Sequence, residues 1–105
     1  PINYGAVVTC RPVGVLNMED ESGEDAKILA VPTEDVTGLY RNVLELEDVD
    51  ELLRLQIQHF FDHYKDLETG KWVKIRGWDD AAAARREIMD SVERYNALPE
   101  KPENW

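Results

Sequence analysis

The first half of the chain contains two short apolar runs of the kind that form β-strands. Residues 6–18, AVVTCRPVGVLNM, are rich in β-branched side chains and are interrupted by Pro12 and Gly14, which predicts one strand with a bulge or two short strands. Residues 28–32, ILAVP, form the second run, and we expect the two runs to pair as a hairpin. Residues 33–46 contain turn signals and polar spacing, which predicts an irregular connection.

The pattern changes to a helical period from Asp48 onward. Apolar residues at steps of three and four predict an amphipathic helix from Asp48 to Leu67. Its apolar face consists of Val49, Leu52, Leu53, Ile57, Phe60, Phe61, Tyr64 and Leu67. Asp48 and Glu51 form a candidate capping box at the start of this helix, and Gly70 is a candidate stop signal.

A short strand and a second helix follow. Residues 71–78, KWVKIRGW, alternate in character and predict a strand. A second helix is expected to begin near Asp79 or Asp80 and to end at Pro99. Its apolar stripe consists of Ala84, Ile88, Val92 and Tyr95. Strands followed by helices, without a repeating β-α-β order, predict an α+β fold with a small antiparallel sheet.

Length and composition narrow the class of protein. The 105 residues suit one domain, which we expect over residues 1–98, followed by an extended tail over residues 99–105. A formal net charge of −10, from 12 basic and 22 acidic residues, argues against nucleic acid as a partner. No apolar run approaches the roughly 20 residues of a membrane span, and no basic and apolar leader opens the chain. With Cys10 as the single cysteine, we expect a soluble, cytoplasmic protein without a membrane partner or internal disulfide.

Residues 19–27, EDESGEDAK, place five carboxylates in nine positions at the expected turn between the two strands. Asp25 and Lys27 alternate along the second strand and therefore share a face, and Asp20 can converge on them across the turn. Two carboxylates and an ammonium group suit a divalent cation that carries a phosphate. The alternative is a solvated, charged hairpin tip, and composition alone favours this alternative.

Two histidines lie four residues apart on the predicted long helix. His59 and His63 have a spacing that can bind zinc, but a zinc protease would need a glutamate where the chain has Phe60. A polar helix edge, or a contact between subunits that titrates near neutral pH, explains the pair better.

Tyr64 and Lys65 follow directly. The pair could hold a phosphate through one hydroxyl and one ammonium group. A core tyrosine and a surface lysine are the simpler interpretation of the same two residues. The residues alone therefore leave a phosphate site open without requiring it.

Two long segments resemble the soluble, Mg²⁺-dependent inorganic pyrophosphatases. They are RPVGVLNMEDESGEDAKILAVP and IQHFFDHYKDLETGKWVKIRGW, and the similarity runs in order from about Ala6 to Tyr95. The resemblance implies an OB-like antiparallel β-barrel, present here in part, with two flanking α-helices and a mouth lined by carboxylates. It also implies an enzyme that hydrolyses pyrophosphate to two phosphates with a metal-activated water and several Mg²⁺ ions.

The same resemblance assigns roles to individual residues. It makes Asp20 and Asp25 metal ligands and Lys27 a phosphate contact. It makes Tyr64 and Lys65 ligands of the phosphate that leaves second. It also places His59 and His63 where bacterial relatives have subunit contacts, so the resemblance implies a homo-oligomer. Glu21 and Glu24 are expected to lie outside the direct ligand set or in solvent.

The chain also departs from the family pattern. The D-x-D-P-x-D stretch that supplies the water-activating base is absent from the 105 residues, so no catalytic residue is assigned. The first residues, PINYG, resemble a family segment that normally precedes that stretch, which makes Tyr4 a candidate phosphate ligand. Either an internal stretch is missing at Gly5 or Ala6, or the likeness is coincidental.

These departures lead us to expect a domain that lacks its N-terminal part. A barrel without some of its strands exposes edges and apolar surface, so we expect low stability or association. We also expect little or no catalysis by this polypeptide alone. The alternative functions are a non-catalytic module that binds metal and phosphate, and an acidic oligomerisation domain.

Overall fold

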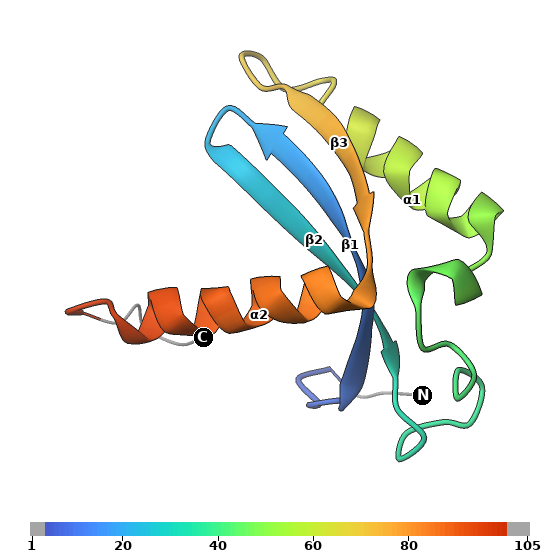
Figure 1. Ribbon diagram of the computed structural model, residues 1–105. Coiled ribbons are helices and arrows are strands. Elements are labelled where there is room, and N and C mark those ends of the chain that lie inside the picture. The colour runs from blue at the N-terminus through green and yellow to red at the C-terminus, as the bar shows by residue number, and fades with distance from the viewer. Residues whose placement is uncertain (1–3, 101–105) are drawn as a thin grey trace.

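The computed structural model describes residues 4–100, and within them a three-stranded sheet packs with two α-helices (Figure 1). Both pairs of neighbouring strands are antiparallel, in the order β2-β1-β3. In chain order the elements are β1 (Cys10–Asp20), β2 (Gly23–Pro32), the 3₁₀ turn η1 (Leu46–Asp48), α1 (Glu51–His63), β3 (Val73–Asp79) and α2 (Ala81–Asn96). The predicted α+β class with a small antiparallel sheet is confirmed.

The β1–β2 hairpin is longer than the apolar runs alone predicted. Its Cα pairs extend from Cys10 opposite Pro32 to Asp20 opposite Gly23, so most of the acidic segment belongs to the strands. Only Glu21 and Ser22 form the turn. The strands persist because a strand sends alternate side chains to opposite faces, which divides the carboxylates between two environments.

The bulge predicted in the first strand is confirmed, since the β1–β2 register shifts between Pro12 and Gly14. Gly14 also permits a close approach, because a Cβ atom there would lie 2.7 Å from Leu46 Cδ1. The connection between β2 and α1 is irregular, as expected, until η1 begins at Leu46. Arg11 holds this connection against β1 by donating hydrogen bonds to the carbonyl oxygens of Val43 (3.0 Å) and Tyr40 (2.9 Å).

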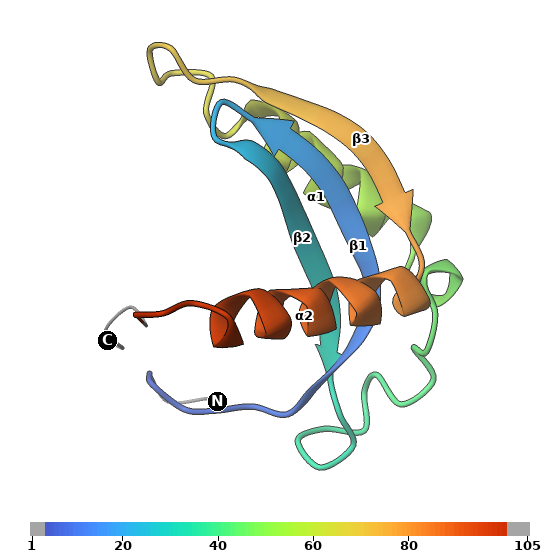
Figure 2. The same ribbon diagram turned by 60° about the vertical axis from the view of Figure 1, so that its left-hand side comes forward.

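The core lies around β1, the central strand. Burial follows from its position, because β1 has a strand on each side and helices cover both faces (Figure 2). The buried apolar side chains of the described residues are Val13, Val15, Leu16, Met18, Leu46, Val49, Ala81 and Ala84. Each of the four β1 side chains is at most 2% exposed.

The second helix begins where the sequence predicted. Asp80 is the N-cap residue of α2, and its side chain accepts a hydrogen bond of 2.9 Å from the backbone N–H of Ala83. The helix ends at Asn96, ahead of Pro99. It crosses the sheet on the face opposite α1 (Figure 2).

The first helix is shorter than predicted at both ends. The predicted capping box of Asp48 with Glu51 is wrong, because Asp48 Oδ2 accepts from the backbone N–H groups of Leu44 and Glu45, at 3.0 Å each. Asp48 thus stabilises the 3₁₀ turn η1, and α1 starts after Asp50.

At its other end, α1 stops at His63 instead of continuing to Leu67. Backbone bonds from Asp66 to His63, from Glu68 to Lys65 and from Lys71 to Glu68 span three residues each and replace the α-helical bonds. Leu67, predicted on the apolar face, is fully exposed, and the helix itself has no buried residue.

Some sequence predictions lie partly outside the described residues. Residues 1–3 of the PINYG segment and residues 101–105 of the predicted tail belong to this part of the chain. In residues 4–100, no helix is both long and apolar enough to cross a membrane. Cys10 is a free, exposed thiol at the start of β1.

Candidate functional site

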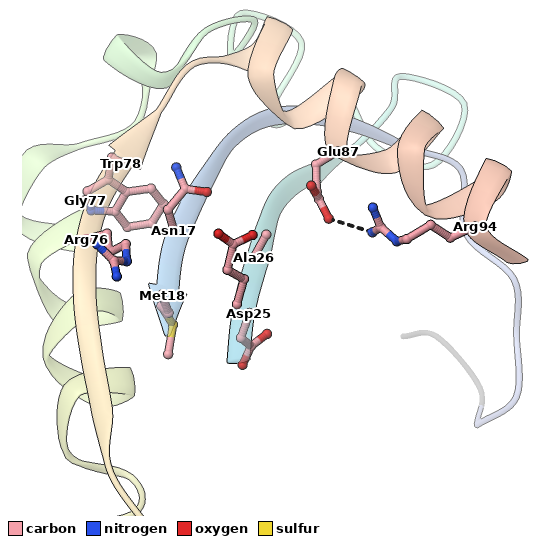
Figure 3. Close-up of a pocket in the computed structure, with 10 residues that line it drawn as sticks. Asn17, Met18, Asp25, Ala26, Arg76, Gly77, Trp78, Glu87 and Arg94 are labelled. Atoms are coloured by element: carbon pink, nitrogen blue, oxygen red, sulfur yellow. Dashed lines mark hydrogen bonds and ion pairs between the residues drawn. The ribbon is translucent and has the colours of Figure 1, made fainter. Parts of the chain in front are cut away.

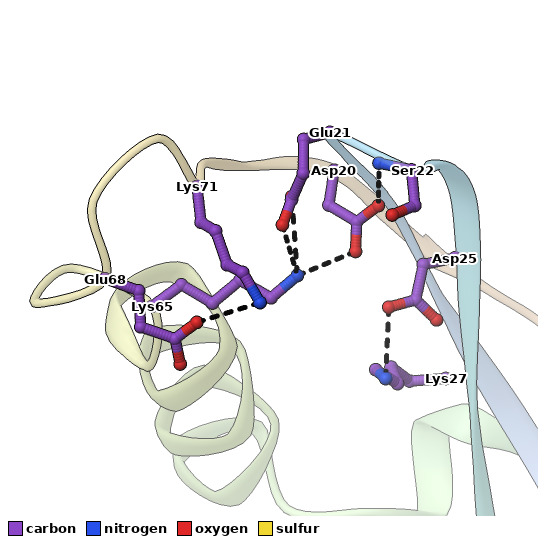
Figure 4. Close-up of polar contacts among 8 residues, drawn as sticks. All are labelled: Asp20, Glu21, Ser22, Asp25, Lys27, Lys65, Glu68 and Lys71. Atoms are coloured by element: carbon purple, nitrogen blue, oxygen red, sulfur yellow. Dashed lines mark hydrogen bonds and ion pairs between the residues drawn. The ribbon is translucent and has the colours of Figure 1, made fainter.

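The candidate site lies at the turn between β1 and β2, beside the turn that follows α1 (Figure 4). Five charged side chains from these segments form what we call the tip cluster: Asp20, Glu21, Asp25, Lys27 and Lys65. The turn itself orients the first of them, since Asp20 Oδ1 accepts a hydrogen bond of 2.8 Å from the backbone N–H of Ser22. The acidic segment and the residues after α1 therefore meet, although they are far apart in the sequence.

Lys65 is the centre of the first ion pair. Its Nζ donates to Asp20 Oδ2 at 2.8 Å and lies 3.4 and 3.5 Å from the two carboxylate oxygens of Glu21. The Lys65 and Asp20 side chains are 14% and 12% exposed, so this pair is largely shielded from water. The hydrogen bond from Lys65, and then that from Ser22, lower the pKa of Asp20. The bond to Asp20 raises the pKa of Lys65, so both groups are charged at neutral pH.

Asp25 and Lys27 form the second ion pair. They share a face of β2, as predicted, and the Lys27 Nζ lies 3.0 Å from Asp25 Oδ2. Lys27 also lies over the ring of Phe61 from α1, with Nζ 5.4 Å from the ring centroid, which is a cation–π distance. The second pair is thus held between the hairpin and the helix.

The tip cluster fits part of a magnesium site. Mg²⁺ prefers oxygen ligands and is usually bound through one or two carboxylates, with water and substrate phosphates completing its shell. Asp20 and Asp25 supply two carboxylates, and hydrogen bonds keep Asp20 ionised. Within residues 4–100 no group of three or more His, Cys, Asp or Glu side chains is arranged to hold a metal ion. The described part of the chain therefore offers a partial donor set.

Of the two predicted phosphate-binding tyrosines, one lies beside the cluster. Tyr64 precedes Lys65, stacks on Phe60 with centroids 5.8 Å apart and meets Phe61 edge-on at 5.5 Å. It remains 39% exposed. Tyr4 is fully exposed and lies before the start of β1, whereas Asp20 is at the end of that strand. The structure does not bring Tyr4 to the tip cluster, and its role stays a prediction.

The two histidines lie near each other on the exposed side of α1. The rings of His59 and His63 have centroids 4.5 Å apart. His63 Nδ1 is 2.9 Å from Asp66 Oδ2, and its Nε2 is 3.8 Å from Asp62 Oδ2. The bond to Asp66 raises the pKa of His63. Both rings are accessible to another molecule, and the subunit contact remains a prediction.

Glu21 is the contact that sequence reasoning did not identify. It was expected outside the direct ligand set or in solvent, without a named partner, and its carboxylate lies against Lys65, 44 residues away along the chain. Adjacency to Asp20 in the turn was the only available signal. Spacing within the acidic segment could not predict a partner from the far end of α1.

A second hollow lies between the sheet and α2, with a volume of about 620 Å³ (Figure 3). Its two arginines are already paired, because Arg76 contacts Glu19 and Arg94 lies 3.1 Å from Glu87. These arginines are therefore engaged within the chain, whereas the tip cluster combines the donor types predicted for metal and phosphate. We place the candidate site at the tip cluster.

Sequence comparison relates the chain to one family of known proteins. The family model of inorganic pyrophosphatase matches residues 1–96. The inorganic pyrophosphatase of Yersinia pestis is 61% identical over 94 residues, and that of Salmonella typhimurium is 58% identical. Both matches cover 90% of this chain but only 54% and 53% of the relatives, so the chain spans about half the length of these curated relatives.

Solved structures agree with the sequence comparison. Inorganic pyrophosphatase from Helicobacter pylori superposes with a TM-score of 0.86 at 38% identity, covering 91% of this chain and 56% of that one. The enzyme from Thermus thermophilus gives 0.82 at 44% identity, covering 92% and 56%. These neighbours have an OB-like fold, which confirms the predicted fold class, present here in part as three strands with two flanking helices. The chain belongs to the inorganic pyrophosphatase family.

Proposed function

We propose that the chain is part of an enzyme that hydrolyses inorganic pyrophosphate to two phosphates with Mg²⁺ as its cofactor. The supporting observation is the tip cluster, in which three carboxylates and two ammonium groups form ion pairs at one end of the sheet. The names of the relatives support the same reaction. We further propose that the protein acts in the cytoplasm.

Each predicted residue receives a role in this proposal. Asp20 and Asp25 hold divalent cations, while Lys27 and Lys65 bind phosphate oxygens through their ammonium groups. The Tyr64 hydroxyl donates to the same phosphate as Lys65, and Tyr4 is assigned to phosphate on the family resemblance alone. Bound divalent cations lower the pKa of a water molecule, so that hydroxide is available near neutral pH.

The reaction itself is a hydrolysis without an enzyme-bound phosphoryl group. The water oxygen forms a bond to one phosphorus atom and the bridging P–O bond breaks. One water proton stays with the phosphate that receives the water oxygen and the other passes to the leaving phosphate, which gives two hydrogen phosphates. Lys27 and Lys65 stabilise the charge that develops on the phosphate oxygens. These two residues supply electrostatic stabilisation, and neither is proposed as the base.

The group that activates water is not among these 105 residues, because no D-x-D-P-x-D stretch occurs in them. We therefore propose that this polypeptide by itself is inactive or nearly so, since loss of such a group costs orders of magnitude in rate. Phosphate release from Mg²⁺-pyrophosphate, measured together with the intact mass of the protein, tests the proposal. Turnover by a chain of 105 residues would contradict it.

Mg²⁺ binding provides a direct test of the ligand assignment. We expect Asp20→Asn and Asp25→Asn each to weaken Mg²⁺ binding by about tenfold or more, because each removes a charged oxygen donor. Isothermal titration calorimetry measures the change. Asp35→Asn is the matched control, since Asp35 is an exposed aspartate in the connection after β2. Equal Mg²⁺ affinity in all four proteins would refute the assignment.

We also propose that the protein forms a homo-oligomer with His59 and His63 at a subunit contact. The two rings lie together on the exposed side of α1, and the His63 side chain is 52% exposed. The nearby carboxylates favour the charged imidazolium of His63, which makes a contact at this position sensitive to pH.

A further inference from the structure

We propose that Glu21 is a positioning residue for Lys65, and that through this contact Glu21 makes phosphate binding by Lys65 depend more strongly on a bound cation. This inference rests on the proposed function. It concerns what the cluster does before either ligand arrives. Each pair joins a residue proposed as a cation ligand to a residue proposed as a phosphate ligand (Figure 4).

The Lys65 pair shows the arrangement most clearly. Its ammonium group makes one short contact with Asp20 and two longer contacts with the oxygens of Glu21. Both Lys65 and Asp20 are mostly shielded from solvent. Removing Lys65 would leave the Asp20 carboxylate uncompensated in a poorly hydrated place, which is costly.

The second pair has the same composition. Asp25 holds Lys27 at 3.0 Å, and the ring of Phe61 lies under the Lys27 ammonium group. Lys27 can therefore leave Asp25 without losing all of its favourable contacts. Every carboxylate and every ammonium group of the tip cluster therefore has an oppositely charged partner within the cluster.

These contacts oppose binding of either ligand alone. When Asp20 turns to a cation alone, Lys65 is left beside that cation, and the two positive charges repel each other. When Lys65 turns to phosphate alone, the carboxylates of Asp20 and Glu21 are left beside an anion. With both ligands present, Asp20 and Asp25 face the cation while Lys27 and Lys65 face the phosphate, so every charge keeps an opposite partner.

Glu21 has a separate part in this exchange. Both of its carboxylate oxygens contact the Lys65 ammonium group separately from Asp20, at 3.4 and 3.5 Å, so it holds that group near the cluster after Asp20 turns away. Because Glu21 also disfavours an anion next to Lys65, it strengthens the dependence of phosphate binding on the cation. Its replacement by glutamine should weaken both effects.

The test is a set of calorimetric titrations of the 105-residue chain. Inorganic phosphate is titrated into the chain in the absence of Mg²⁺ and in the presence of saturating Mg²⁺. In the reverse experiment, Mg²⁺ is titrated into the chain in the absence of phosphate and in the presence of saturating phosphate. We expect each ligand to increase the affinity for the other by the same factor, about tenfold or more. Glu21→Gln should tighten phosphate binding without Mg²⁺ and reduce that factor. The reduction is a readout that a merely structural role of Glu21 would not change.

Glu24→Gln is the matched control. It makes the same charge change three residues away, but Glu24 pairs across the hairpin with Glu19, on the face of the sheet opposite Asp25. The coupling factor should stay unchanged in Glu24→Gln. Circular dichroism spectra of the variants establish that each is folded.

The outcomes separate this inference from the proposed function. If Mg²⁺ binds but phosphate affinity is the same with and without it, the coupling is refuted while the metal assignment stands. If the coupling is present and Glu21→Gln leaves it unchanged, the role of Glu21 is refuted. If Mg²⁺ does not bind at all, both the inference and the proposed function are overturned.

Discussion

His63 connects the end of α1 to the turn that follows it. The hydrogen bond from its ring to Asp66, and the nearby charge of Asp62, raise its pKa above the ordinary value of 6.5. A raised pKa means that the folded chain favours the charged ring. The resulting stabilisation is fully present below about pH 6.5 and is lost as pH rises through the folded-state pKa.

We therefore expect Asp66→Asn to lower the pKa of His63 and to remove this pH dependence from the stability of the folded chain. Titration of the His63 ring signals by NMR measures the pKa, and denaturant midpoints on both sides of pH 6.5 measure stability. Glu68→Gln is the control, because Glu68 pairs with Lys71 in the same turn at 3.1 Å. A His63 pKa that is equal in the wild type and in Asp66→Asn would contradict the prediction.

Single residues also show how far the sequence allows the site to be predicted. The shared face of Asp25 and Lys27 follows from strand alternation, which is a local property, and the structure confirms it. The contact between Lys65 and Glu21 depends on where α1 ends and how the chain returns to the hairpin. Sequence spacing does not contain that information, so the hairpin face could be predicted and its partner from α1 could not.

The helices differ in how strongly local residues determine their bounds. Asp80 precedes four consecutive alanines and caps α2 without competition, so the predicted start was correct. Asp48 looked equally suitable, but the preceding backbone N–H groups of Leu44 and Glu45 use its carboxylate. A capping side chain that can serve two adjacent turns makes the sequence signal ambiguous, and packing decides between them.

The α2 cap leads to a stability prediction. Asp80→Ala should lower the free energy of unfolding by about 1 kcal/mol, because the backbone N–H of Ala83 loses its side-chain acceptor. Chemical denaturation measures the loss. Asp90→Ala, at an exposed position inside the same helix, is the control and should change stability much less. If both variants lose the same stability, the cap does not contribute as proposed.

Across residues 4–100, few apolar side chains are buried and many are exposed. The sheet buries its central strand, while β2 and β3 are the outer strands of the described sheet. A groove of about 370 Å³ runs between β2 and α2, with Ala26, Ile28, Ile88 and Val92 among its lining residues. Exposed strand edges and apolar grooves favour association.

We therefore expect the 105-residue chain to self-associate as its concentration rises, and Val92→Lys to weaken that association by placing a charge in the groove. Sedimentation velocity over a range of protein concentrations measures both effects. Leu39→Lys is the control, since Leu39 is 82% exposed in the connection and lies outside the groove. If association survives Val92→Lys but is lost in His59→Ala, the contact between chains lies on α1 and the groove takes no part in it. A single monomeric species at every concentration would refute association through either surface.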